Sequence, residues 1–216
     1  MIHLDDQKTL ATHLEKLWPG LDEVTKLKLE QYRQLIIADP QNLTRLIDPL
    51  DFVIGHLLDV KALIESGLLE YPAMDLGSGV GVPGVVAALM GSGNWILAES
   101  EKSKAEFLNR AVNLLHLGNV EVHGERGEVV LLKKSVQSVV ARAVGPVSRI
   151  FGWIGPCSTW NNIILFKGPK WVQERSEFIN TPLSRKLRIS ESEYHIGYGY
   201  GPRFIVKFSR VPRGTG

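Results

Sequence analysis

The chain has 216 residues, of which 44% are hydrophobic and 22% charged, and this ordinary composition excludes a disordered chain and a coiled coil. The single cysteine, Cys157, excludes an intramolecular disulfide and fits a reducing compartment such as the cytoplasm. The net charge is +2, but its distribution is uneven: residues 1–72 hold 7 Lys/Arg and 12 Asp/Glu, whereas residues 146–216 hold 11 Lys/Arg and 4 Asp/Glu. Either the basic last third contacts a polyanion, or its surface is merely unevenly charged.

The first 71 residues are predicted to be helical. Leu10, Leu14 and Leu17 recur at spacings of four and three, which places them on one apolar stripe of a helix. Two further helical patterns follow, one ended by Asp39-Pro40 and one running from Pro49 to about Gly67. No strand pattern occurs in this region, so we expect a helical extension over residues 1–71.

Beyond Pro72, short apolar runs alternate with helical patterns, which predicts βαβ units and a parallel sheet with helices on both faces. The last two runs are joined by a short Gly/Pro turn, which predicts a hairpin. This order resembles the class I methyltransferase fold, an α/β, Rossmann-like, seven-stranded and mostly parallel sheet that ends in an antiparallel hairpin, here over residues 72–216. The expected strands are 73–76, 95–98, 120–123, 136–143, 162–166, 193–198 and 203–211, and the expected helices are 82–90, 103–115, 127–133 and 147–156.

The most informative stretch is the glycine-rich segment 75–84, which reads DLGSGVGVPG between a predicted strand and a predicted helix. Glycine permits positive φ and close approach of the backbone to a ligand, so a nucleotide-type ligand is expected. The spacing Gly79-x-Gly81-x-x-Gly84, with Glu99 beyond it, matches a dinucleotide fingerprint. The alternative begins at Asp75 and resembles motif I of S-adenosylmethionine (SAM) methyltransferases. We favour it because an acid on the strand has no natural place in the dinucleotide pattern.

A more specific resemblance follows from the Val-Pro-Gly ending of this segment. The loop is similar to that of the RsmG or GidB family, the bacterial 16S rRNA guanine-N7 methyltransferases. The similarity extends along nearly the whole chain, through NLT at 42–44, LAES at 97–100, ERGE at 125–128, ARA at 141–143 and FKG at 166–168. It implies methyl transfer from SAM to N7 of a specific guanine in the decoding region of 16S rRNA.

The resemblance also implies a cofactor site at the predicted strand ends. Glu99 suits the two ribose hydroxyls, because a carboxylate has enough acceptor sites for both, and a solvated surface acid is the alternative. Asp75 either contacts SAM or holds N–H groups of the loop, and Glu128 either lies by the adenine or caps its helix. The residues implied for SAM are Asp75, Gly77, Ser78, Gly79, Gly81, Val82, Glu99, Gly127, Glu128 and Arg142.

Arg142 and Lys167 are the candidate catalytic residues, since each follows an apolar run at a predicted strand end, where open α/β sheets bind ligands. Arg142 is expected to hold the SAM carboxylate or an RNA phosphate and to position rather than transfer protons. Lys167 is expected to contact RNA. His56 and Asp59 lie three residues apart on one helix face, and a bond that fixes the helices to the sheet explains them at least as well as substrate contact does.

Guanine N7 carries a free lone pair, so no proton must leave before methyl transfer and no general base is required. We expect catalysis mainly by alignment of the reacting atoms. The expected partner is 16S rRNA or the small ribosomal subunit, contacted by basic residues of the last third such as Arg185, Lys186 and Arg213.

Nothing in the sequence indicates a signal peptide, a membrane span or metal-ligand spacing among the histidines, so we expect a cytoplasmic monomer without a metal. Three alternatives stay open. They are a SAM-dependent methyltransferase of small molecules, a non-catalytic SAM- or nucleotide-binding regulator, and an NAD-dependent oxidoreductase.

Overall fold

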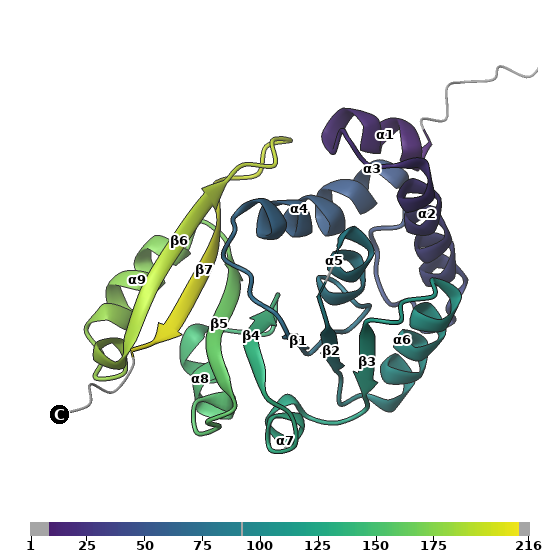
Figure 1. Cartoon of the computed structure of the whole chain (residues 1–216). Coiled ribbons are helices and arrows are strands. Elements are labelled where there is room, and N and C mark those ends of the chain that lie inside the picture. The colour runs from purple at the N-terminus through teal and green to yellow at the C-terminus, as the bar shows by residue number, and fades with distance from the viewer. Residues whose placement is uncertain (1–8, 92, 212–216) are drawn as a thin grey trace, which may run out of the picture.

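The computed structural model describes residues 9–91 and 93–211. Within these ranges one seven-stranded sheet has the order β3-β2-β1-β4-β5-β7-β6 (Figure 1). The first five strands in chain order are parallel, and β7 runs antiparallel between β5 and β6. The expected class I methyltransferase fold is therefore confirmed. The strands are β1 (Ala73–Leu76), β2 (Trp95–Ala98), β3 (Val120–His123), β4 (Val136–Ala141), β5 (Trp160–Lys167), β6 (Leu187–Tyr194) and β7 (Arg203–Arg210).

Helices cover both faces of the sheet (Figure 1). The N-terminal helices are α1 (Leu10–Leu17), α2 (Glu23–Ala38), α3 (Pro49–Phe52), the π-helix η1 (Val53–Leu57) and α4 (Leu58–Glu65). The helices between and after the strands are α5 (Gly84–Met90), α6 (Lys102–Leu114), α7 (Gly127–Leu131), α8 (Val147–Ile154), α9 (Trp171–Ile179) and the short 3₁₀ helix η2 (Ser184–Lys186).

Strands β1, β2, β4 and β5 send alternate side chains into two apolar clusters, because successive residues of a strand point to opposite faces. The edge strand β3 contributes only Val120 and Val122, both to the same cluster. In β5, Ile164 enters one cluster, while Ile163 and Leu165 enter the other. The first cluster joins the sheet to α5, α6 and the N-terminal helices, and Leu14 and Tyr32 are fully buried there. The second cluster lies under α7, α8 and α9. The N-terminal helices thus share a core with the sheet.

The largest differences from the predicted elements lie in the last third of the chain. The hairpin's first strand is Leu187–Tyr194 rather than 193–198, and α9 was not predicted at all. Alternate residues of this strand, LRISESEY, are only partly buried and several of them are polar, so the strand lacks the apolar alternation that would predict it. β4 ends at Ala141 rather than at 143, because Ala143 has a φ of +58°. The tail 212–216, with Arg213, lies outside the described residues.

No helix in the described ranges is long and apolar enough to cross a membrane.

Candidate functional site

The glycine-rich loop leaves the end of β1 and bends back over the sheet. Gly77, Gly79 and Gly81 have φ values of +70°, +56° and +93°, which L-residues with side chains rarely adopt. The N–H groups of Gly77 and Ser78 both donate to the carbonyl of Ala98, at 2.9 and 3.2 Å, so the loop is tied to the end of β2. Glycine is therefore required here by the backbone path itself.

Asp75 lies buried beneath this loop on β1. Its Oδ2 accepts a hydrogen bond from the Gly84 N–H at 2.9 Å. Burial raises the pKa of this carboxyl to about 7, although the Gly84 N–H and the charge of Arg142 both act to lower it. Holding the loop's N–H is thus what Asp75 does in this structure, which is one of the two roles expected for it.

The space around Gly84 gives a first test of this packing. A Cβ at Gly84 would lie 2.3 Å from Leu97 Cδ2 and 2.9 Å from Asp75 Oδ2. Gly84→Ala is expected to lower the free energy of unfolding by about 2 kcal/mol, because the buried strand must shift to admit the methyl group. Urea denaturation measures this. Gly118→Ala, where a Cβ meets nothing within 4 Å, is the matched control and should change stability little. Equal stability of both variants would contradict the packing.

Glu99 follows β2 and is only 8% exposed, so it is not a solvated surface acid. Its Oε2 accepts from the Gly79 N–H at 2.9 Å and its Oε1 from the Glu101 N–H at 2.8 Å. A carboxylate offers about four lone-pair sites, so about two acceptor sites remain. Two adjacent hydroxyls, as in a ribose, match that remaining capacity.

A pocket of about 320 Å³, here called the glycine-loop pocket, lies beside these residues. Gly77, Gly127 and Glu128 line it, as expected. Ser78, Gly79, Gly81 and Val82 shape the loop but do not line the pocket. Its lining residues are Leu76, Gly77, Ala98, Ser100, Glu125, Arg126, Gly127, Glu128, Val144 and Trp153.

Seven of the ten lining residues are not among those implied for SAM. Five of the seven lie within the quoted motifs at 75–84, 97–100 and 125–128, and Val144 follows the ARA motif at 141–143, so these six could have been found from the sequence. Trp153 lies on the exposed side of α8, and no sequence pattern marks it as a pocket residue. Together with the free acceptor sites of Glu99, this lining suits a nucleoside ligand.

A second pocket of about 480 Å³, here called the Lys167 pocket, opens beyond the ends of β4 and β5. The two pockets are lined by consecutive residues, since Arg142 and Ala143 line this one and Val144 lines the other. The left-handed backbone of Ala143 turns the chain between them. The pocket is lined by Leu46, Gly55, Asp59, Arg142, Ala143, Phe166, Lys167, Gly168, Pro169, Tyr194, Tyr200, Gly201 and Arg203.

Arg142 connects β4 to the N-terminal helices. Its Nη1 donates to the Gly55 carbonyl at 2.7 Å and to Asp59 Oδ2 at 3.1 Å, and its Nη2 donates to His56 Nδ1 at 2.8 Å. Gly55 and His56 belong to the π-helix η1, a rare form that is frequent at functional sites. Three of the five guanidinium N–H donors are therefore used, and two remain for a ligand. The guanidinium lies in the Lys167 pocket rather than in the glycine-loop pocket.

His56 is neutral in this network. Arginine only donates, so Nδ1 of His56 accepts, and Nε2 carries the proton that bonds Thr44 Oγ1 at 3.1 Å. Burial and the Arg142 charge lower the pKa of His56 to about 3. The bonds of His56 and Asp59 to Arg142 fix the N-terminal helices to the sheet.

This histidine predicts a pH dependence of stability. The unfolded chain binds a proton on His56 below about pH 6.5, whereas the folded chain does not until about pH 3, so stability falls as the pH drops between these values. His56→Gln is expected to remove up to about 1.4 kcal/mol per pH unit of that slope. Urea denaturation between pH 4 and 7 measures it. The exposed His195→Gln is the control, and a slope that is unchanged by His56→Gln would refute the expectation.

Asp59, on α4, holds two guanidinium groups at once. Its Oδ2 accepts from Arg142, while its Oδ1 accepts from Arg203 Nη1 at 2.6 Å and from the Tyr194 hydroxyl at 2.7 Å. Asp59 is only 4% exposed, so these charges are largely removed from water. Sequence reasoning noted Asp59 but not that it joins β4 to the terminal hairpin.

Lys167, at the end of β5, is held by a residue that sequence reasoning missed. Its Nζ lies 2.9 Å from Glu174 Oε2 on α9 and donates to Glu174 Oε1 at 3.0 Å, and Oε1 also accepts from the Val147 N–H at 2.8 Å. Lys167 also donates to the Gly145 carbonyl at 3.5 Å. These three oxygens match the three N–H donors of the ammonium group, so a ligand would compete with them for Lys167.

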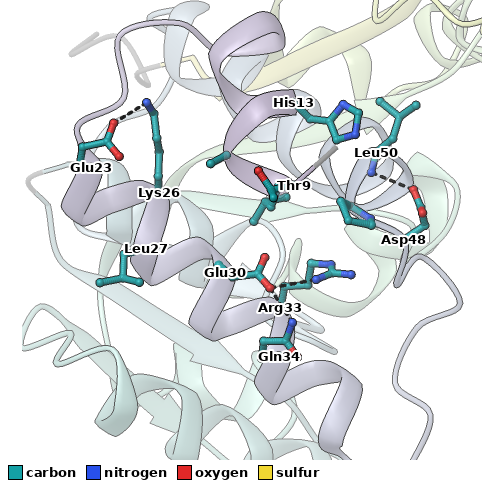
Figure 2. A pocket seen from close by; sticks show the side chains of 13 residues that line it. Thr9, His13, Glu23, Lys26, Leu27, Glu30, Arg33, Gln34, Asp48 and Leu50 are labelled. Atoms are coloured by element: carbon teal, nitrogen blue, oxygen red, sulfur yellow. Dashed lines mark hydrogen bonds and ion pairs between the residues drawn. The ribbon is translucent and has the colours of Figure 1, made fainter. Parts of the chain in front are cut away.

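A larger hollow, of about 1020 Å³, lies between α1, α2 and α3 (Figure 2). Its charged side chains pair with one another, as Lys26 does with Glu23 at 2.7 Å and Arg33 with Glu30 at 3.0 Å. The glycine-rich segment and the strand-end residues Glu99, Arg142 and Lys167 all lie outside it, so we do not regard it as the functional site despite its volume.

Across residues 9–91 and 93–211, no cluster of three or more His, Cys, Asp or Glu residues could hold a metal ion.

A glycine loop after the first parallel strand, an acid after the second and a sheet that ends in an antiparallel hairpin define a class I SAM-dependent methyltransferase. The chain belongs to the GidB family, rRNA small subunit methyltransferase G, whose model matches residues 25–191.

Known proteins of this name are similar over most of the chain. The ribosomal RNA small subunit methyltransferase G of Pseudothermotoga lettingae is 32% identical over 89% of this chain and 86% of its own length. That of Rhodopirellula baltica is 36% identical over 77% and 73%. Among solved structures, the methyltransferase domain of METTL16 has a TM-score of 0.57 at 14% identity, covering 86% of this chain and 79% of that one, which shows the shared fold.

Proposed function

We propose that the chain transfers a methyl group from SAM to N7 of a guanine in 16S rRNA, with SAM in the glycine-loop pocket and the guanine in the Lys167 pocket. The observation that carries this proposal is that consecutive residues line the two pockets, Arg142 and Ala143 the one and Val144 the other. A methyl donor and its acceptor must lie within reach of one another, and residues 142–144 are where we place that approach.

The residues around the first pocket suit SAM, which when bound supplies a methyl group on a positively charged sulfur. Glu99 would accept the two ribose hydroxyls, and Gly127 and Glu128 would lie by the adenine. The loop that contains Asp75, Ser78, Gly81 and Val82 would carry the backbone of Gly77 and Gly79 close to the amino-acid part. A Cβ at Gly79 would meet only the Gly77 carbonyl, at 3.9 Å, so that space is open to a ligand.

The second pocket is lined by donors, which suits an acceptor-rich base edge. Guanine presents O6 and N7, both acceptors, and Arg and Lys are their usual partners. Arg142 would bind that edge or an adjoining phosphate with its two remaining N–H groups, and the Lys167 ammonium would contribute its positive charge and compete for a hydrogen bond there. Both are therefore proposed to touch the substrate and to align N7, not to carry protons.

The same pocket has no free base. Both oxygens of Asp59 are bonded to Arg142, Arg203 and Tyr194. N7 attack needs none, because the N7 lone pair forms the new C–N bond, the electron pair of the broken S–C bond stays on sulfur, and no proton is lost. Alignment of the reacting atoms supplies the rate enhancement.

We also propose that the enzyme acts as a cytoplasmic monomer and that residues 1–71 and 72–216 work as one unit. The bonds from His56 and Asp59 to Arg142 cross that boundary and support the second point.

The test is direct. Calorimetry with SAM and with NAD should show binding of SAM alone. Labelled SAM is then incubated with small ribosomal subunits and with naked 16S rRNA, and N7-methylguanine is mapped by cleavage chemistry. We expect one modified guanine. Absence of label in both RNA forms would refute the proposal. Activity on small molecules without RNA would favour the alternative methyltransferase.

A further inference from the structure

The turn between β6 and β7 brings an aromatic ring to the Lys167 pocket. Tyr200 lines this pocket and is 50% exposed. Tyr198, two residues earlier in the same turn, is 52% exposed but does not line it. The two rings are equally exposed, and only one of them faces the pocket.

The backbone of this turn is fixed from several sides. Gly197, Tyr198 and Gly199 have φ values of +73°, +56° and +78°, and the Tyr200 N–H donates to the Gly197 carbonyl at 3.0 Å. A Cβ at the following Gly201 would lie 2.9 Å from Pro169, so the turn packs closely on the loop after β5. Tyr200 is thus held in place without being buried.

The ring of Tyr200 is also oriented by a charge. The guanidinium carbon of Arg203 lies 5.0 Å from the ring centroid, within cation–π range. Arg203 is in turn bonded to Asp59 at 2.6 Å. A buried carboxylate therefore fixes the arginine, and the arginine supports the ring.

We propose that Tyr200 is the stacking residue for the target base, holding the purine by its face while Arg142 and Lys167 bind its edge. This rests on the proposed function. Unpaired RNA bases are typically held on aromatic rings, because every base has a π-face and its edges stay free for recognition. A ring that is half exposed, preorganised and set among cationic donors has the features of such a platform.

Three variants test this assignment with small ribosomal subunits and labelled SAM. Tyr200→Ala is expected to lower kcat/KM for the RNA at least about tenfold, since a base–aromatic stack is lost. Tyr200→Phe keeps the ring and should stay close to wild type. Tyr198→Ala is the matched control and should also stay close to wild type. Affinity for SAM should be equal in all four proteins.

A second measurement does not depend on turnover. Calorimetry with guanosine monophosphate, in the presence of S-adenosylhomocysteine, should show binding that Tyr200→Ala loses and Tyr198→Ala retains. If wild type is inactive with rRNA but the variants still differ in binding guanosine monophosphate, the proposed function is refuted and the purine-binding role of Tyr200 is supported. Tyr200→Ala that matches wild type in both measurements, or equal losses in Tyr200→Ala and Tyr198→Ala, would overturn the assignment.

Discussion

Arg142→Gln is expected to lower methyl transfer to rRNA at least about a hundredfold, a loss of the size seen when one positioned donor is removed from a reacting centre. The guanidinium lines the Lys167 pocket, so the loss should fall on turnover with RNA, while SAM affinity changes little. Arg142→Lys should not restore activity, because an ammonium cannot reproduce the three bonds to Gly55, Asp59 and His56.

Stability must be measured alongside, because Arg142 also neutralises buried Asp59. Asp59 keeps its bonds to Arg203 and Tyr194, so the variant should remain folded, with a loss of stability of about 3 kcal/mol or less. Lys102→Gln, which changes an exposed cation of α6 outside the basic last third, is the control and should alter neither turnover nor stability. Near wild-type turnover in folded Arg142→Gln would show that the guanidinium does not serve the reaction.

The part of the site that could be predicted from sequence lies within single βα units. The pattern DLGSGVGVPG places Asp75 on a strand and the glycines in the turn after it, and the apolar run before Glu99 places that acid at the next strand end. Adjacent parallel strands end at the same edge of a sheet, so the two acids had to be neighbours of the loop. Local patterns and one topological rule suffice for this half of the site.

The other half depends on contacts between distant segments. Asp59 bonds Arg142 across 83 positions and Arg203 across 144, and nothing in the spacing of these residues indicates such pairings. Glu174 was not predicted because α9 was not predicted, and its role in the site follows only from its ion pair with Lys167. Whether a buried charge binds a ligand or a partner within the chain is decided by tertiary packing, which periodicity does not record.

Glu99→Gln is expected to raise the dissociation constant for SAM at least about tenfold. The carboxylate already accepts from the Gly79 and Glu101 N–H groups, and its remaining sites are those proposed for the ribose. Glutamine has one acceptor oxygen, so its amide NH₂ would point at one of these backbone N–H groups, and two donors would then face each other. The change therefore weakens both the hydrogen bonding of the loop and the binding of the ligand, although the side-chain shape is kept.

Calorimetry with SAM measures this effect. Glu106→Gln, which changes an exposed acid of α6, is the control. Glu99→Asp separates the two contributions. It retains both oxygens but places them one methylene further from the loop, so its affinity should lie between those of wild type and Glu99→Gln. If Glu99→Gln binds SAM as wild type does, Glu99, which does not line the glycine-loop pocket, only braces the loop, and the ribose must be held by residues that do line it.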